Sequence, residues 1–419
     1  MAQSSSSQRR TFWTVILGGG AVLLACLAAY LAGQVGDPGW WRREATAYNL
    51  RHAVPDEGNA ALYYTNALGF SGIDTKVHKG IIQVDWKSPL ATSELALLEG
   101  LDPALDALEG ATRLPHCVYR LDPEIRPFEY GLPYLSRFKP AVQLLALRAR
   151  ARAAEGRSVE AGEDLLAALR MGAHQDRGFL IHQLVGVACK GYAYPGLERL
   201  AMDAPPAPEV LERMAAEMGR LEASRPSAAE RWEAEHLMGR GNLECLYRPG
   251  QAMNLIASSG PGGLRGTWAW LGLAFTKPLH RCRQDHEALS ALQAKEKPTP
   301  ADLARMDVLA TSNPLLFSGA RPRESFRKGL AMERGTRILL QLRAKRLREG
   351  SYPETLAGLD APEDPFSGRP FVYRRLDPDA FLLYSLGPNG VDDGGTLDFR
   401  DPKGFNGPSD MIFGRPPTP

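Results

Sequence analysis

Cysteine is scarce in this 419-residue chain, which has five, and no two of them lie close together in sequence. This wide spacing excludes a CxxC zinc or redox site and a disulfide-dense scaffold. A large excess of one charge is also missing, because 50 Lys and Arg nearly balance 48 Asp and Glu to give a net charge of +2. The balance argues against a nucleic-acid-binding protein that relies on bulk charge, so we expect no nucleic-acid partner.

Several catalytic and nucleotide-binding motifs are absent as well. The sequence has no Gly-Lys dipeptide, which excludes a Walker A loop, and it contains no GxGxxG, HExxH or GxSxG. Cys282 and His286 would share one face of a helix at i, i+4. Without a paired-ligand motif, however, a solvated helix is expected there rather than a zinc site. We therefore predict no catalytic residues, no organic cofactor and no enzymatic activity.

Charge is completely absent from residues 11–33, which read TFWTVILGGGAVLLACLAAYLAG. At ~1.5 Å per residue a helix of this length spans about 34 Å, enough for a hydrocarbon core of roughly 30 Å. Trp13 and Tyr30 lie near its ends, and Trp40 and Trp41 follow as aromatic anchors. We predict a tail over residues 1–10 and a single-pass transmembrane helix over 11–33 that contacts the lipid bilayer.

Two other interpretations use the same residues. Residues 23–26, LLAC, resemble a bacterial lipobox, which would make Cys26 a lipidated N-terminus. Arg9 and Arg10 resemble a twin-arginine export signal, although arginines before an anchor are expected in any case. Because basic residues flank both sides of the segment, their count does not decide the orientation.

The middle of the chain, residues 34–320, has the pattern of an irregular α-helical domain with Pro/Gly-rich connections. Its clearest feature is a helical hairpin over residues 141–170 with a turn at 155–158, which resembles one tetratricopeptide unit. The second helix of the hairpin carries one apolar stripe, formed by Ala161, Leu165, Ala168 and Leu169. The pattern does not recur one period later, so no regular array is expected. The apolar run 268–275 is too short to cross a bilayer. Its two Trp could lie at a membrane surface or under a loop, but packing in a core is expected.

The C-terminal segment, residues 321–419, has a different composition. An amphipathic, strongly basic helix is predicted over 323–348 and ends at Gly350. We expect its basic outer face to be solvated. Two strands over 371–375 and 380–385 form a hairpin, and a Gly-rich acidic loop follows. Asn389, Asp392, Asp393 and Asp410 bring hard oxygen donors to this part of the chain.

These C-terminal motifs occur in a recognisable order: GSYP, DPFSGRPFVYR, LLYSLGPNGVDDGG and SDMIF after a long helix. Residues 325–413 thereby resemble the globular head of the type II secretion major pseudopilins. The resemblance implies a small α+β C-terminal domain that binds structural Ca²⁺. The implied metal site comprises Leu383, Ser385, Asn389, Asp392, Asp393 and Asp410, with Asn389 where the family usually has Asp. The whole arrangement resembles membrane-anchored proteins of large-genome bacteria such as planctomycetes or myxobacteria.

The expected fold class is therefore mainly α: a transmembrane helix, an irregular α-helical domain with a TPR-like hairpin, and a small α+β pseudopilin-like domain. The expected function is a non-enzymatic interaction or structural module of the bacterial envelope. It would be anchored in the inner membrane with its bulk in the periplasm, and would bind a protein partner of unknown identity. Two alternatives stay open: an envelope enzyme with an unrecognised site between the domains, and a component associated with type II secretion.

Overall fold

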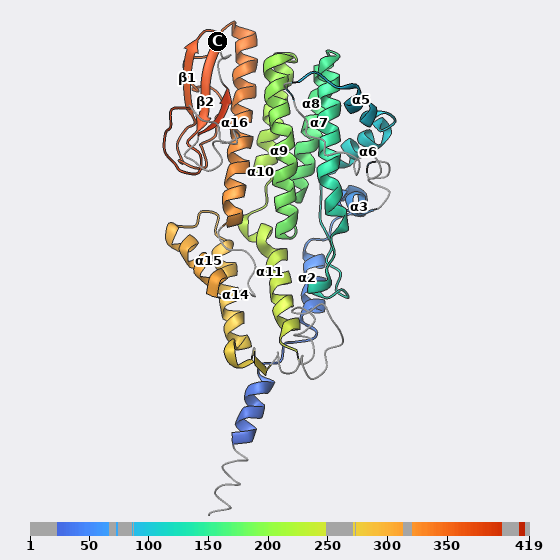
Figure 1. Ribbon diagram of the computed structural model, residues 1–419, viewed down its shortest axis with the longest axis vertical. Coiled ribbons are helices and arrows are strands. Elements are labelled where there is room, and N and C mark those ends of the chain that lie inside the picture. Colours follow the sequence, from blue (N-terminus) through green and yellow to red (C-terminus); the bar gives the residue numbers. More distant parts are fainter. Residues whose placement is uncertain are drawn as a thin grey trace, which may run out of the picture. The chain divides into compact units, whose positions relative to one another are not determined.

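The computed structural model describes residues 23–66, 73, 86, 88–248, 271–272, 274–312, 321–395 and 410–414. Helices dominate these residues and the one sheet among them has three strands, which confirms the prediction of a mainly α protein (Figure 1). The chain divides into two compact units. Unit 1 combines Met1–Arg51, Leu121–Tyr130 and Glu235–Phe317, and unit 2 combines His52–Arg120, Gly131–Ala234 and Ser318–Pro419.

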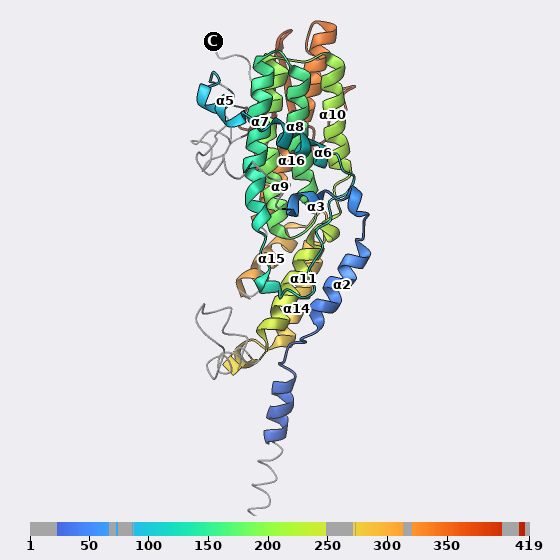
Figure 2. The same ribbon diagram turned by 90° about the vertical axis from the view of Figure 1, so that its right-hand side faces the viewer.

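Unit 2 is built around five long helices that run side by side in both views (Figures 1 and 2). They are α7 (Phe138–Ala154), α8 (Ser158–Ala173), α9 (Leu180–Asp203), α10 (Pro208–Ala223) and α16 (Arg321–Glu349). Shorter elements of the same unit are η1 (Asp56–Gly58), α3 (Ala60–Thr65), α5 (Thr92–Leu98), α6 (Asp102–Thr112), η4 (Pro133–Arg137) and η5 (His174–Asp176). One continuous apolar core joins all five long helices.

The helical hairpin predicted over residues 141–170 is confirmed as α7 and α8. Its turn contains Gly156, whose φ of 78° lies in the left-handed region that favours glycine. The four residues of the predicted apolar stripe are all buried, as are Leu145 and Ala149 on the facing helix. The stripe packs inward because residues at i, i+4, i+7 and i+8 share one face of an α-helix.

The C-terminal hairpin is also confirmed, as β1 (Val372–Asp377) and β2 (Ala380–Ser385), with a third antiparallel strand β3 (Met411–Gly414) beside β2. The sheet packs against α16 on the side away from the other long helices (Figure 1). At their contact the ring of Phe413 lies directly over Gly335, which has no side chain to displace it. Because α16 also packs against α9 and α10, the described residues of 321–395 and 410–414 share the core of the helices that precede them.

The basic face predicted on α16 is not simply solvated, which corrects the sequence analysis. Arg334 and Arg337 form ion pairs with Glu222, and Arg348 pairs with Glu209 and Glu212. Since these acids lie on α10, the basic residues bind α16 to its neighbour. The spacing of charges along one helix could not reveal that an acidic helix lies opposite.

Unit 1 contains α2 (Trp40–Arg51), η3 (Pro127–Glu129), α14 (Leu279–Gln293), α15 (Pro300–Ser312) and most of α11 (Ala228–Leu246). Arg240 and Glu244 of α11 pair with Glu287 and Arg283 of α14, so the two helices are antiparallel. A smaller apolar cluster lies between them and consists of Leu243, Leu246, Tyr247, Leu279, Cys282, Leu289, Leu292 and Met306.

The predicted transmembrane span extends beyond the described residues. Its first part, residues 11–22, lies outside them, whereas residues 23–32 are helical. Within the described part of the chain, no helix has the length and hydrophobicity needed to cross a membrane. The short helix exposes apolar side chains, with Leu23 and Leu24 exposed by 72% and 67%. The span over 11–33 stays a prediction.

Candidate calcium site

The end of strand β2 and the start of β3 bring the two halves of the predicted calcium site together. Ser385, the last residue of β2, pairs in register with Met411 of β3. Asp410 therefore lies beside the turn that leaves β2, although 25 positions of sequence separate residues 385 and 410. This antiparallel pairing explains why the motif has one acidic group after YSLG and a second near the C-terminus.

One buried carboxylate beside the site, Asp364, is fully satisfied by the fold. Its Oδ1 accepts hydrogen bonds from the Ser385 hydroxyl at 2.8 Å and from the Phe366 N–H at 3.0 Å. Its Oδ2 accepts from the Leu386 N–H at 3.2 Å. Asp364 could not be singled out from the sequence, because Ser385 and Leu386, which donate to it, are not its neighbours in sequence. Asp364 joins the DPFSG turn to the end of β2.

The exposed part of the loop holds its acidic groups by local hydrogen bonds. Asp392 Oδ1 accepts from the Tyr384 hydroxyl at 2.7 Å and from the Gly394 N–H at 2.9 Å. These two donors lower the pKa of Asp392, the Tyr384 hydroxyl having the larger effect. The Asn389 side chain donates to Asp393 Oδ2 at 3.0 Å. The loop is thus ordered around its own carboxylates, as Asp and Asn commonly order turns.

Asp410 differs from the other acids of this region. Its Oδ2 accepts a hydrogen bond from the Gly395 N–H at 2.7 Å, whereas its Oδ1 is buried and accepts no well-formed hydrogen bond from the described residues. The residue as a whole is 0% exposed. Burial raises the pKa of Asp410 and outweighs the backbone N–H groups of Gly395 and Asp393, which lower it; the charges of Asp393 and Asp392 raise this pKa further. A buried acceptor without a donor costs about 1–3 kcal/mol, and more when it is charged.

Gly395 makes the contact to Asp410 possible. Its φ of 67° lies in the left-handed region, and a Cβ at this position would lie 3.1 Å from side-chain atoms of both Leu382 and Tyr384. Only glycine therefore combines this backbone conformation with the close approach to β2. The glycine-rich sequence after Asp393 thus positions one backbone donor of the site.

The structure brings the six predicted residues to one end of the sheet, but it does not form a complete cage of side chains. Leu383 and Ser385 are fully buried, and the Ser385 hydroxyl is already bonded to Asp364. These two residues could therefore contribute only backbone oxygens. Among the described residues, no three His, Cys, Asp or Glu side chains are grouped so that they could hold a metal ion. Residues 396–409, which precede Asp410, lie outside the described part of the chain.

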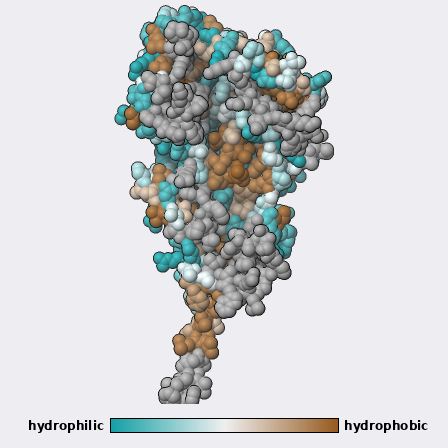
Figure 3. Space-filling view, in the orientation of Figure 1, coloured by the Kyte–Doolittle hydropathy of each residue, from teal (hydrophilic) through white to brown (hydrophobic). Residues whose placement is uncertain are grey.

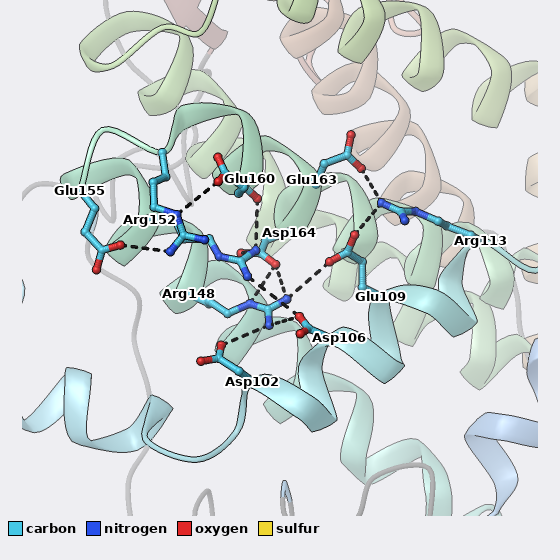
Figure 4. A network of polar contacts seen from close by, with 11 residues as sticks. Asp102, Asp106, Glu109, Arg113, Arg148, Arg152, Glu155, Glu160, Glu163 and Asp164 are labelled. Carbon is cyan, nitrogen blue, oxygen red and sulfur yellow. Dashed lines mark hydrogen bonds and ion pairs between the residues drawn. The ribbon is translucent and has the colours of Figure 1, made fainter.

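Unit 2 also contains a buried ion network that the sequence analysis did not identify (Figure 4). Arg148 of α7 donates to Asp164 of α8 at 2.6 Å and to Asp106 of α6 at 2.7 Å. Arg152 donates to the second oxygen of Asp164 at 2.8 Å. The side chains of Arg148 and Asp164 are 3% and 0% exposed. Burial raises the pKa of Asp164 to about 6, against the opposing effects of Arg148 and Arg152.

A second buried network joins α16 to the middle of the bundle. Lys190 of α9 pairs with Asp176 at 3.0 Å, and Arg225 pairs with Glu333 of α16 at 2.7 Å. Arg225 also donates to Asp176 at 3.4 Å and so connects the two pairs. Burial alone would raise the pKa of Asp176, but the charges of Lys190 and Arg225 outweigh it and lower that pKa. Every acid here faces a cation, which is typical of a structural network.

The expectation of a solvated helix around Cys282 and His286 is wrong, because both side chains are buried. The Cys282 thiol contacts the Tyr247 hydroxyl at 3.2 Å, and the ring of His286 packs against that of His236. Burial lowers the pKa of His286 to about 4, and nearby His236 and Arg240 lower it further. The i, i+4 spacing of this pair marks the face of α14 that packs on α11.

No protein-family model, curated protein or solved structure matches this chain. The pseudopilin resemblance of residues 325–413 therefore rests on the sequence motifs themselves.

Proposed function

We propose that this chain is a membrane-anchored, non-enzymatic module of the bacterial envelope whose C-terminal domain is stabilised by Ca²⁺. In this proposal residues 11–33 hold the chain in the inner membrane, with its bulk in the periplasm. The helices of unit 2 form a scaffold, and the sheet against α16 forms its calcium-binding end. An association with type II secretion would extend the same proposal to a particular machine.

The calcium proposal is carried by the buried Oδ1 of Asp410, which accepts no well-formed hydrogen bond within the described part of the chain. The fold satisfies Asp364 completely, whereas Asp410 has a raised pKa and lies near Asp392 and Asp393. Hard oxygen ligands from carboxylates and backbone carbonyls are the donors that Ca²⁺ prefers. A bound cation would supply the partner that the buried oxygen of Asp410 lacks.

The calcium proposal is tested on the full chain by comparing thermal unfolding with millimolar calcium and with a chelator. Ligand at 100 times its dissociation constant stabilises the folded state by about 2.7 kcal/mol, so unfolding should shift upward by several degrees. Terbium supplies a direct probe of binding, because Tyr384 donates to Asp392 and would sensitise terbium luminescence in the site. Calcium should displace the terbium signal.

Asp410→Asn should abolish both the calcium-dependent shift and the terbium signal. The matched control is Asp377→Asn, because Asp377 lies in the turn of the β1–β2 hairpin, where it accepts from the Asp379 N–H at 2.7 Å. The control should keep the full calcium effect. Equal unfolding temperatures of the wild type with calcium and with chelator would refute the proposal.

The anchor is tested independently by extracting membranes with alkali in the absence of detergent. The chain should stay in the membrane pellet, because a charge-free segment of this length inserts stably. Recovery in the soluble fraction of a chain that starts near residue 34 would contradict the anchor. External protease should degrade most of the chain in spheroplasts, and protection would reverse the proposed orientation.

An apolar stripe on α9 supports the proposed binding of a protein partner. Ile181 is 47% exposed and Ala188 is exposed, while Leu184 and Val185 between them are half-buried. Their i, i+3, i+4 and i+7 spacing places all four on one face of the helix. Apolar area is also plainly visible near the middle of the view in Figure 3. Exposed apolar surface of this kind is typical of interaction sites.

A further inference from the structure

The chain that leaves the predicted membrane span is fixed to unit 1 at several successive residues. Leu31 packs against the apolar cluster between α11 and α14. The side chain of Gln34 accepts a hydrogen bond from the Leu279 N–H at 2.7 Å, and the Gly36 N–H donates to the Tyr247 carbonyl at 2.9 Å. Unit 1 is therefore attached immediately at the end of the span, with no flexible spacer between them.

A second segment, residues 271–276, is bound to the same end of the span. These residues are helical where the structure describes them, and they precede α14. The Tyr30 hydroxyl donates to the Ala274 carbonyl at 2.5 Å, and the Tyr30 ring stacks on that of Phe275 with their centres 5.4 Å apart. Both views show this short helix beside the N-terminal helix (Figures 1 and 2). The contacts of Tyr30 thus fix the position of Ala274 and Phe275 along the axis of the predicted span.

This short helix buries one side and exposes an aromatic residue on the other. Residues 268–270 and 273 of the run 268–275 lie outside the described part of the chain. Ala274 is fully buried, whereas Phe275 is 56% exposed, so core packing does not extend to Phe275. Exposed basic groups follow at His280 and Arg281. An exposed aromatic ring followed by basic residues is the pattern of segments that lie in the interface of an anionic bilayer.

We propose that residues 271–272 and 274–281 form a second membrane contact, which lies on an anionic lipid surface beside the anchor. The inference rests on the proposed anchor over residues 11–33. If those residues span the bilayer, Tyr30 lies at the headgroup level, and its contacts hold Phe275 at the same depth. Phe275 then inserts between the headgroups while Arg281 contacts anionic lipid. Two contacts at one level restrict the tilt of unit 1 on the membrane.

The full-length protein is reconstituted into vesicles of phosphatidylcholine and phosphatidylglycerol in equal parts, and an environment-sensitive fluorophore reports its depth. The first reporter is Cys26, which is exposed within the predicted span, labelled in a Cys245→Ala background. The second is Gly272→Cys, because a Cβ there meets no atom within 4 Å and the Tyr30–Phe275 contact stays intact. The control is Val308→Cys on α15, since Val308 is 64% exposed. Both introduced cysteines also carry Cys26→Ser and Cys245→Ala.

Spin-labelled lipids with the quencher at the headgroup or near the end of the acyl chain separate the possible depths. We expect the label at residue 272 to lose more than half of its fluorescence to the headgroup quencher and little to the deep quencher. The label at Cys26 should respond to the deep quencher, and the label at 308 to neither. Arg281→Glu should reduce headgroup quenching at 272, whereas Arg305→Glu on α15 should not.

The outcomes distinguish this inference from the proposed anchor. Deep quenching at Cys26 with no quenching at 272 would overturn the interfacial contact and leave the anchor intact. Deep quenching at 272, or equal quenching at 272 and 308, would overturn it as well. No quenching at Cys26 would overturn the anchor, and the inference that rests on it would fail with it.

Discussion

The contact between Phe413 and Gly335 provides a sharp test of how the C-terminal sheet is held on α16. A Cβ added at Gly335 would lie 2.5 Å from Cδ2 of Phe413 and still closer to two other ring carbons. Phe413 is 2% exposed and packs edge-on against Phe371, so its ring has little room to move. Gly335→Ala should therefore push β3 away from α16.

The loss of stability caused by Gly335→Ala is best measured against Gly191→Ala on α9, where an added Cβ meets no atom within 4 Å. Both substitutions gain about 0.5–1 kcal/mol from replacing glycine inside a helix. Only Gly335→Ala also incurs overpacking, which typically costs about 1–3 kcal/mol. Because both variants gain the same helix propensity, that gain cancels in the comparison. Gly335→Ala should therefore be less stable than Gly191→Ala by about 1–3 kcal/mol.

Hydrogen exchange measured by mass spectrometry locates this effect, because two compact units need not unfold together. Amides of β3 should exchange faster in Gly335→Ala than in the wild type, and Gly191→Ala should leave them unchanged. Adding Phe413→Leu to Gly335→Ala should recover part of the loss, as a favourable coupling in a double-mutant cycle. Unchanged exchange in β3, or equal stability of the two alanine variants, would refute the close contact.

Two further predictions concern the buried network and the proposed partner surface. The pKa of Asp164 is about 6 in the fold against 3.8 for the ordinary group, so the folded state takes up a proton first as pH falls. The stability of the wild type relative to Asp164→Asn should therefore rise by about 2 kcal/mol between pH 7.5 and pH 4 in urea unfolding. No change would contradict burial as the dominant effect on this pKa. On α9, Ile181→Lys should weaken crosslinking of the chain to membrane proteins. Val159→Lys, at a similarly exposed apolar residue of α8, should leave it unchanged. Equal crosslinking of the two variants would exclude the α9 stripe as the partner-binding surface.

Local patterns predicted most of the secondary structure because they depend on neighbouring residues. The α7–α8 hairpin follows from its apolar stripe and Gly156, and the β1–β2 hairpin follows from two short strand-forming runs around a turn. The C-terminal end of α16 agrees with the prediction because Gly350, with φ of 80°, stops the helix. In each case the decisive residues lie within a few positions of the element.

Long-range pairing could not be derived in the same way. Arg148 and Asp164 read as ordinary charged residues of two helices, and only the packing of α6, α7 and α8 reveals that they are buried together. Asp364 is likewise identified only when β2 is placed beside the DPFSG turn. For the candidate calcium site, motif order grouped residues that the structure places at one end of the sheet, but burial of the Asp410 carboxylate depended on β3 pairing with β2.

The pairing of α16 also decides which basic residues of the chain are available to a membrane. From sequence alone, the basic face of α16 was expected to be solvated and therefore free to meet acidic lipid. In the structure Arg334, Arg337 and Arg348 pair with acids of α10, and releasing them would leave those acids without partners. Neutralising such charges should lower the stability of unit 2 rather than its affinity for lipid. Electrostatic attraction to an anionic bilayer is therefore better assigned to Arg281, which follows the segment held by Tyr30 at the end of the predicted span.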